Sequence, residues 1–414
     1  MSVVRNSVFM IGWEYPPHNS GGLGVACQGM TEALSDQNTQ IYFTLPHHTS
    51  GHITHMDLLE CSDPSWFSNG DSTQPPFYAY SSSVSSPHIF TDGVMDLHTL
   101  NLLPQSEMES KVDRYAELVA DKGIDIKNDF DVIHAHDWMS FPAAMRLAEA
   151  TKKPFIAHVH STEFDRIPSG NGSPYILSTE YEGMQQATRI VAVSFYTKQL
   201  LVHKYGIDAS KIDVVHNGIT PLFSPPDVGR HHFAPKRPVI VFMGRLTMQK
   251  GADYFLALSQ AVLRQLPNAL FVVAGSGDMY HELLLQTAGR GLSAHVLFSG
   301  FVRDEQREKL LDRADVFVMP SVSEPFGLVA LEAAQRKTPV IVSSNSGVSE
   351  VMPSSHVVDF WDIDKMTSEI VRLVSKDDVS KQVVQNQLHD LESVTWGVAA
   401  EKIRNVYKRA FLGR

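Results

Sequence analysis

The sequence predicts an α/β fold built from two Rossmann-like, doubly wound domains. Short apolar strands alternate with longer amphipathic segments along almost the whole chain, a pattern typical of βαβ units and parallel sheets. The chain has 414 residues, which exceeds what one hydrophobic core normally serves. A proline-rich, polar stretch at 220–238 separates the strand candidates into two sets, as expected of a linker.

Each set of strands predicts one domain. The first set is SVFMIG (7–12), IYFTLP (41–46), DVIHAH (131–136), PFIAHVH (154–160), RIVAVS (189–194) and IDVVHNG (212–218). The second is PVIVFMGRL (238–246), ALFVVAGSG (269–277), HVLFSGF (295–301), DVFVMPS (315–321), TPVIVSS (338–344) and HVVDF (356–360). Helical spacing of apolar residues predicts helices at 251–266, 279–288, 304–314, 327–337 and 396–411.

These elements predict a first domain at 1–217 and a second at 218–394, followed by a helix at 395–414 that could cap either domain. Residues 47–128 fit the alternation less well. They are polar and irregular, with strand patterns only at 76–80 and 94–102 and a helical pattern near 107–121. We therefore expect an insertion in the first domain, which either shapes a substrate entrance or is a plain surface elaboration.

Composition narrows the class of protein. The formal charge of −11 and a pI near 5.9 disfavour nucleic acid and acidic membranes as partners, so anionic ligands require local cations. The two cysteines, Cys27 and Cys61, have no metal-binding or redox spacing and suit a reducing compartment. No stretch has the length of a signal peptide core or a membrane span. We expect a cytoplasmic protein without an integral membrane span.

Candidate binding residues follow the strands, because ligands of open α/β sheets bind beyond the carboxyl ends of the strands. In the first domain the glycines of GGLG at 21–24 would let backbone N–H groups approach an anion at a helix N-terminus. A turn without a ligand explains them equally well. The pattern is neither the dinucleotide motif nor a Walker loop, which disfavours hydride transfer and NTP hydrolysis.

Two cations follow a strand of the second domain. Arg245 offers a planar fork to phosphate oxygens and Lys250 a point charge, so together they could hold a diphosphate and stabilise it as it departs. The alternative is that both are solvated surface cations. Their place at the carboxyl end of a strand favours the functional interpretation.

Histidines occur in two pairs, His134 with His136 and His158 with His160. Residues i and i+2 of a strand share a face, so either pair could bind a metal, although no third ligand is evident nearby. Buried, hydrogen-bonded histidines are the favoured interpretation. Contact of the last histidine of each strand with substrate is the remaining one.

Two acids bracket the start of a helix in SEPFGLVALEA at 323–333. Glu324 lies on the loop after a strand, and a helix beginning near Phe326 or Gly327 would offer the N–H groups of Gly327 to Val329 to a phosphate. Glu332 falls roughly one turn further along the helix. Taken singly, each acid is more simply a helix cap or a solvated side chain; together with Arg245, Lys250 and GGLG they indicate a phosphate site.

At these residues the chain resembles the family 4 retaining glycosyltransferases, which have the GT-B fold and include bacterial glycogen synthases. The resemblance rests on WEYPPHNSGGLGVA (13–26), FDVIHAHDW (130–138), PFIAHVHSTEFD (154–165), GRLTMQKG (244–251) and SEPFGLVALEA with TPVIVS (338–343), in the family's order. It covers essentially the whole chain. It also implies that the final helix crosses back onto the first domain and that the two domains close around a cleft.

The resemblance implies roles for individual residues. The donor diphosphate would contact Arg245, Lys250 and Gly22, and the backbone N–H groups of Leu328 and Val329. Glu324 and His160 would bind the donor sugar, with Glu332 on the ribose. The remaining assignments place Phe301 and Val302 at the base, Phe326 and Gly327 in the donor site, and Gly21, His136 and Asp137 on the acceptor side.

The family's chemistry implies a transferase that moves a hexose, with glucose ranked first, from a nucleotide diphosphate sugar to an acceptor hydroxyl. It implies retention of anomeric configuration, no metal and no cofactor. An α-glucan ranks first as acceptor, and a lipid-linked or small-molecule acceptor second. Asn19 and Val25 stand where glycogen synthases usually carry Lys and Asp, so the glucan is less firmly implied than the family. An epimerase or hydrolase on the same fold is the further alternative, and the oligomeric state is left open.

Overall fold

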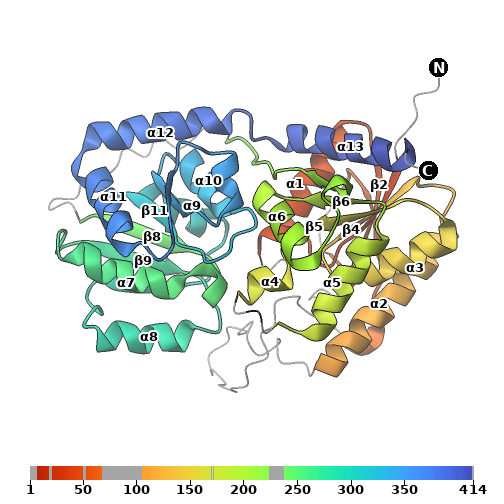
Figure 1. Cartoon of the computed structure of the whole chain (residues 1–414), viewed down its shortest axis with the longest axis horizontal. Helices are drawn as coiled ribbons and strands as arrows, with labels where there is room; N and C mark the ends of the chain where they lie inside the picture. Colours follow the sequence, from red (N-terminus) through yellow and green to blue (C-terminus); the bar gives the residue numbers. More distant parts are fainter. Residues whose placement is uncertain are drawn as a thin grey trace. The chain divides into compact units, whose positions relative to one another are not determined.

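The computed structural model describes residues 7–17, 21–49, 53–67, 105–168, 170, 172–222 and 237–412. Asn19, the strands expected at 76–80 and 94–102, and most of the proline-rich stretch therefore lie outside the described residues. The chain divides into two compact units (Figure 1). Unit 1 comprises Met1–Glu163, Gly172–Gly218 and Trp396–Arg414, and unit 2 comprises Phe164–Asn171 and Ile219–Thr395.

Unit 1 is built on a parallel sheet. Its described residues form seven strands in the order β3-β2-β1-β4-β5-β6-β7, and every neighbouring pair is parallel. The strands are β1 (Ser7–Ile11), β2 (Gln40–Leu45), β3 (Asp57–Glu60), β4 (Val132–His136), β5 (Phe155–Val159), β6 (Arg189–Ala192) and β7 (Ile212–Val214). All residues of β1, β4 and β5 are buried, as expected of parallel strands that are covered on both faces.

Strand β3 differs from the expectation for residues 47–128. It pairs in parallel with β2 at the edge of the sheet, so the described part of this region contributes a strand to the domain itself. The sequence analysis placed no strand there. Its sequence, DLLE, is four residues long with both ends exposed, too short to give a period-two signal.

Helices cover the unit 1 sheet. They are α1 (Gly22–Asp36), α2 (Gln105–Asp125), α3 (Phe141–Thr151), α5 (Pro174–Gln186), α6 (Phe195–Tyr205) and α13 (Trp396–Leu412), with 3-10 turns η1 (Pro64–Trp66) and η2 (Ala209–Lys211); the short α4 (Glu163–Arg166) spans the boundary between the units. Helices α2 and α5 both pack on α3, which contacts β4 and β5.

The C-terminal helix α13 belongs to unit 1, although it follows unit 2 in the chain. It lies along α1 and contacts β5 and β6 (Figure 1). Gly29 of α1 permits this approach, because a Cβ atom there would lie 2.3 Å from the indole of Trp396. The side chain of Gln37 also donates to the backbone carbonyl of Gly397 at 2.7 Å.

Unit 2 contains the second parallel sheet, with six strands among its described residues in the order β10-β9-β8-β11-β12-β13. They are β8 (Val239–Met243), β9 (Leu270–Ala274), β10 (Val296–Gly300), β11 (Val316–Met319), β12 (Val340–Ser343) and β13 (His356–Val358). Its helices are α7 (Ala252–Leu263), α8 (Tyr280–Gly289), α9 (Asp304–Arg313), α10 (Leu328–Gln335), α11 (Ile363–Ser375) and α12 (Asp377–Leu391), with turns η3 (Met248–Lys250) and η4 (Gly347–Glu350).

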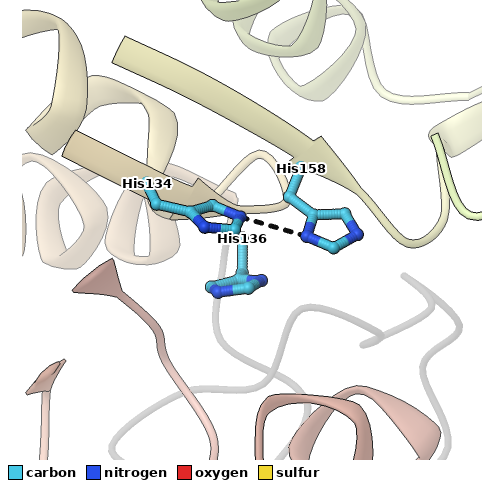
Figure 2. A group of neighbouring side chains, drawn as sticks. All are labelled: His134, His136 and His158. Atoms are coloured by element: carbon cyan, nitrogen blue, oxygen red, sulfur yellow. Dashed lines mark hydrogen bonds between the residues drawn. The ribbon is translucent and has the colours of Figure 1, made fainter. Parts of the chain in front are cut away.

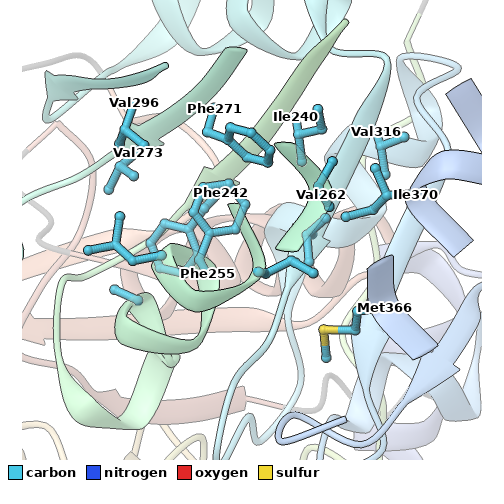
Figure 3. Close-up of a cluster of buried hydrophobic side chains, with 14 of the residues drawn as sticks. Ile240, Phe242, Phe255, Val262, Phe271, Val273, Val296, Val316, Met366 and Ile370 are labelled. Carbon is cyan, nitrogen blue, oxygen red and sulfur yellow. The ribbon is translucent and has the colours of Figure 1, made fainter. Parts of the chain in front are cut away.

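The core of unit 2 lies between its sheet and helices α7 and α11. Phe242 and Phe271 from β8 and β9 meet Phe255 of α7, with ring centroids 5.6 and 5.9 Å apart (Figure 3). Met366 and Ile370 of α11 complete this layer. Burying each such side chain stabilises the fold by about 1.5–3 kcal/mol.

The topology fixes where each unit can bind a ligand. In both sheets successive connections reverse direction once, between β1 and β4 in unit 1 and between β8 and β11 in unit 2. Ligands of open α/β sheets bind beyond the carboxyl ends of the strands at this switch point. Every strand of the two predicted sets is present, and each switch point falls beside predicted site residues.

Candidate functional site

The unit 2 site is organised by an ion pair across its switch point. Lys250 closes turn η3 after β8, and Glu324 lies on the loop after β11. Lys250 Nζ lies 2.7 Å from Oε2 of Glu324, and Ser321 Oγ donates to the same oxygen at 3.3 Å. The side chains are 19% and 9% exposed, so the pair is largely withdrawn from water.

Arg245, the second predicted cation, is partly buried at the carboxyl end of β8 and donates through Nη2 to Oε1 of Gln249 at 3.1 Å. The backbone carbonyl of Gln249 accepts from the N–H groups of Val322 at 2.9 Å and Ser323 at 3.3 Å. Gln249 therefore couples the loop of the cations to the loop of Glu324. Gln249 lies within the motif GRLTMQKG, where the sequence pattern indicates no role for it.

Gly251 makes the approach of these two loops possible. Its φ of +69° lies in the left-handed region, and a Cβ atom there would lie 2.0 Å from the carbonyl oxygen of Pro320. Only glycine fits this position without moving backbone. The residue thus sets how closely Lys250 lies to the end of β11.

The backbone of Glu324 is held by the loop after β12. Its N–H donates to the carbonyl of Asn345 at 2.9 Å, and its carbonyl accepts from Gly347 at 3.0 Å. The Asn345 side chain also donates to the carbonyl of Val322 at 3.0 Å. These bonds fix the Glu324 carboxylate on a rigid loop, and Asn345 was not singled out by the sequence analysis.

Helix α10 begins at Leu328, one or two residues later than predicted. Gly327 is its N-cap, with a φ of +107°, and the N–H groups of Leu328 and Val329 lie in the first turn, which has no intrahelical partners. Both residues are partly exposed. Phe326 is only 3% exposed, so its side chain belongs to the core and only its backbone could serve a ligand.

Glu332, within α10, faces helix α9. Arg307 Nη1 donates to its Oε1 at 3.2 Å, whereas Oε2 is buried without a hydrogen-bond partner among the described residues. Burial raises the pKa of Glu332, and the nearby Arg307 acts in the opposite direction. One carboxylate oxygen is thus held by Arg307, and the other is buried with an unused lone pair. Sequence analysis did not identify Arg307.

The predicted base-binding residues follow β10. Phe301 is 43% exposed and has the guanidinium of Arg303 stacked over its ring at 4.9 Å, and Val302 is half-buried. An exposed aromatic ring at a strand end is suited to stacking on a planar group.

In unit 1 the glycine motif lies at the start of α1. Gly21 is the N-cap in an extended conformation and Gly22, the first helical residue, is exposed. The N–H of Gly24 is already used, because it donates to Oε1 of the buried Glu14 at 2.8 Å. A carboxylate of the protein itself, that of Glu14, therefore accepts from the N-terminus of α1. Glu14 lies three residues after the end of β1, and that position is the signal by which it could have been found.

His160 follows β5 and is 9% exposed. Its backbone N–H donates to Oδ1 of Asp137 at 2.7 Å, and its Nε2 lies 2.9 Å from Nδ1 of His136. His136 and Asp137 were expected on the acceptor side, but they are 0% and 2% exposed. The structure places them beneath His160, because β4 is covered on both faces; the role of His160 itself stays a prediction.

A buried cluster of imidazoles surrounds this position. His134, His136 and His158 lie on the neighbouring strands β4 and β5, with His134 Nε2 hydrogen-bonded to His158 Nδ1 at 3.0 Å (Figure 2). His134 Nδ1 lies 2.6 Å from the hydroxyl of Tyr407 in α13. Burial lowers the pKa of His136 to about 3 and places those of the other three histidines well below their usual value.

The spacing of His134, His136 and His158 would allow them to ligate a metal ion, since their ligand atoms lie within 4.8 Å of one another. Both nitrogens of His134 are already hydrogen-bonded, so an ion bound by all three would have to break one of these bonds. The favoured interpretation of buried, hydrogen-bonded histidines agrees with this geometry. The expectation of a metal-independent protein stays a prediction.

Among the described residues, no helix combines the length and apolar character needed to cross a lipid bilayer.

Comparisons with known proteins give the family. The model for "Glycosyl transferases group 1" matches residues 226–389, and that for "Glycosyltransferase Family 4" matches residues 101–221. An uncharacterized glycosyltransferase of Methanocaldococcus jannaschii, MJ1607, is 31% identical over 97% of this chain and 98% of its own. A glycogen synthase of Mycobacterium tuberculosis is 29% identical over 83% and 80%. A D-inositol 3-phosphate glycosyltransferase of Nocardia farcinica is 29% identical over 56% of each.

Solved structures share the fold. Sucrose-phosphate synthase from Thermosynechococcus elongatus superposes with a TM-score of 0.76 at 16% identity, covering 99% of this chain and all of that one. Anabaena HepE in complex with UDP and glucose gives 0.70 at 16% identity, over 98% and 100%. The two parallel sheets match the two Rossmann-like domains of these proteins. The chain therefore belongs to glycosyltransferase family 4 and has the GT-B fold.

Proposed function

We propose that the protein is a retaining hexosyltransferase that moves glucose from a nucleotide diphosphate sugar to an acceptor hydroxyl without a metal ion. The observation that carries this proposal is the ion pair of Lys250 and Glu324 at the unit 2 switch point, at 2.7 Å. A cation and a carboxylate side by side match a ligand in which a phosphate and a hydroxyl-bearing sugar are joined.

Each part of a nucleotide diphosphate sugar has a chemically matching group in the site. Phosphate oxygens would accept from Lys250, from Arg245 and from the first N–H groups of α10, where negative charge is stabilised. Sugar hydroxyls would donate to Glu324, and ribose hydroxyls to the carboxylate of Glu332, whose side chain is 18% exposed. The cations then act on the charge that grows on the departing diphosphate, which is where stabilisation raises turnover.

Glucose is ranked first because several relatives and neighbours are named for glucose chemistry, including the mycobacterial glycogen synthase and HepE with UDP and glucose. An α-glucan is accordingly the first acceptor to test. A small polyol phosphate is the second, because a D-inositol 3-phosphate glycosyltransferase is 29% identical over 56% of the chain.

The test is a donor and acceptor panel. The protein is incubated with UDP-, ADP- and GDP-glucose, each alone and with glycogen, maltooligosaccharides or inositol 3-phosphate, and nucleotide release is followed with and without EDTA. We expect acceptor-stimulated release that EDTA leaves unchanged, and a product whose anomeric proton shows the donor's α-configuration by NMR. Release that no acceptor stimulates would favour a hydrolase or epimerase, and an inverted product would refute retention.

A further inference from the structure

The buried imidazoles beside His160 form two separate hydrogen-bonded chains. In one, Tyr407 contacts His134, which contacts His158. In the other, His136 Nδ1 lies 2.9 Å from His160 Nε2. The rings of His158 and His160 stack with centroids 4.1 Å apart but share no hydrogen bond. The state of the second chain therefore depends on His136 and His160 alone.

A neutral imidazole carries one N–H and one lone pair, so the pair allows two arrangements. Either His136 donates from Nδ1 to Nε2 of His160, or His160 donates from Nε2 to Nδ1 of His136. Nε2 of His136 is buried and has no partner among the described residues. The second arrangement would place an N–H at that buried atom, and buried N–H groups without a partner are rarer in proteins than under-satisfied buried acceptors.

The first arrangement places no N–H at this buried atom. It leaves a lone pair on the buried Nε2 of His136 and moves the free N–H to Nδ1 of His160, which is not among the buried atoms without a partner. A ligand or solvent can satisfy that N–H. The backbone of His160 is fixed independently, because Asp137 Oδ1 accepts from its N–H at 2.7 Å and from Ser161 N–H at 3.3 Å.

We infer that His136 is a positioning residue that holds His160 in the Nδ1–H tautomer, so that His160 presents a hydrogen-bond donor to the substrate. The group it recognises is an oxygen with a free lone pair, such as a sugar hydroxyl acting as acceptor. His160 then orients its ligand and does not remove a proton through Nδ1. The assignment of that ligand as the donor sugar rests on the proposed function; the tautomer does not.

The test reads the tautomer directly. The full chain is labelled with 15N-histidine, and long-range proton–nitrogen correlations classify each ring nitrogen as protonated or unprotonated, with His160→Gln assigning the signals. We expect protonated Nδ1 and unprotonated Nε2 for His160 in the wild type. His136→Asn should keep this pattern, since an amide can donate from nearly the same place, whereas His136→Leu should give a mixture of tautomers.

Tyr407→Phe is the matched control, because it removes a hydrogen bond from the other chain and should leave the His160 signals unchanged. Protonated Nε2 on His160 in the wild type would overturn the inference, as would an unchanged pattern in His136→Leu. If His136→Leu fails to fold, the wild-type and His136→Asn spectra still decide the question.

Activity supplies a second readout. With the donor found in the panel above, His136→Leu should lower kcat by about 10- to 100-fold, the scale typical of residues that orient a functional side chain. His136→Asn should recover most of that loss. If no donor is turned over at all, the proposed function fails while the spectra still test the tautomer.

Discussion

The backbone N–H of Gly24 donates to the carboxylate of Glu14 at 2.8 Å, which places an internal anion at the N-terminus of α1. We expect Glu14→Ala to lower the free energy of unfolding of unit 1 by about 1–3 kcal/mol, because it leaves a buried donor unpaired. Glu14→Gln keeps an acceptor and loses only the charge, so its cost should be smaller, about 0.3–1 kcal/mol.

Unit 1 can be followed selectively by tryptophan fluorescence. Of the five tryptophans, only Trp361 lies in unit 2, and it is 57% exposed. In a Trp361→Phe background the urea midpoint reported by tryptophan therefore measures unit 1. Equal midpoints for Glu14→Ala and its parent would contradict the role of Glu14.

Gly29→Ala should destabilise unit 1 by about 1–3 kcal/mol through overpacking. The added methyl would lie 2.3 Å from the rigid indole of Trp396, so α13 would have to shift along α1. The same fluorescence assay measures the effect. Gly289→Ala in α8 is the control, because a Cβ there has no heavy atom within 4 Å. Since α8 belongs to unit 2, this control is followed by far-UV circular dichroism of the whole chain, which should show no loss of stability.

Lys250→Ala and Arg245→Ala should each lower kcat by about 10²–10³-fold, because both cations act on charge that develops in the transition state. Arg245→Ala should cost little stability, whereas Lys250→Ala should also destabilise unit 2, because it leaves the largely buried Glu324 carboxylate without its cation. Lys309→Ala, which removes a 70% exposed cation from α9, is the control and should leave kcat unchanged. Unaltered kcat in both site variants would refute the diphosphate assignment.

Stability should fall as the pH falls below about 6.5. The folded state holds His134, His136, His158 and His160 neutral with lowered pKa values, whereas an unfolded chain protonates them near the usual value. Each histidine that charges only on unfolding contributes a slope of up to about 1.4 kcal/mol per pH unit below 6.5. That stability is fully present above 6.5.

Urea unfolding between pH 7 and pH 4.5, in the same Trp361→Phe background, measures this slope. His136→Asn removes one titrating group and should make the slope shallower, since the folded pKa of His136 is about 3. An identical slope in that variant would show that His136 is not held neutral in the folded state.

The sequence predicts the strands well because buried parallel strands are nearly continuous apolar runs, as VIVFM of β8 is. It predicts the site residues of unit 2 as separate candidates, since they lie on the loops after the strands or in the first turns of the helices that follow. It could not predict that Lys250 and Glu324 pair, because they are 74 residues apart and meet only through the adjacency of β8 and β11.

The arrangement of the histidines could likewise be predicted only in part. Their i, i+2 spacing predicts that His134 and His136 share a face of β4, and they do stack, with centroids 4.5 Å apart. Spacing cannot tell whether that face meets solvent or a helix from the far end of the chain. Tyr407 of α13 covers it, and this contact joins residues 273 positions apart in the chain.

If the site binds a nucleotide sugar as proposed, the pairing of Lys250 with Glu324 would also disfavour molecules that carry only one of the two recognised groups. A bare phosphate can take Lys250 only by leaving a largely buried carboxylate without its cation. A free sugar that binds Glu324 does the reverse and leaves the cation without its anion. A phosphate alone or a sugar alone would therefore have to compete with one member of the ion pair for the other. Only a molecule that carries both groups at the right separation would replace the interactions of both residues at once. Under the proposed function, the ion pair would therefore lower the affinity for inorganic anions and free sugars relative to that for a nucleotide sugar.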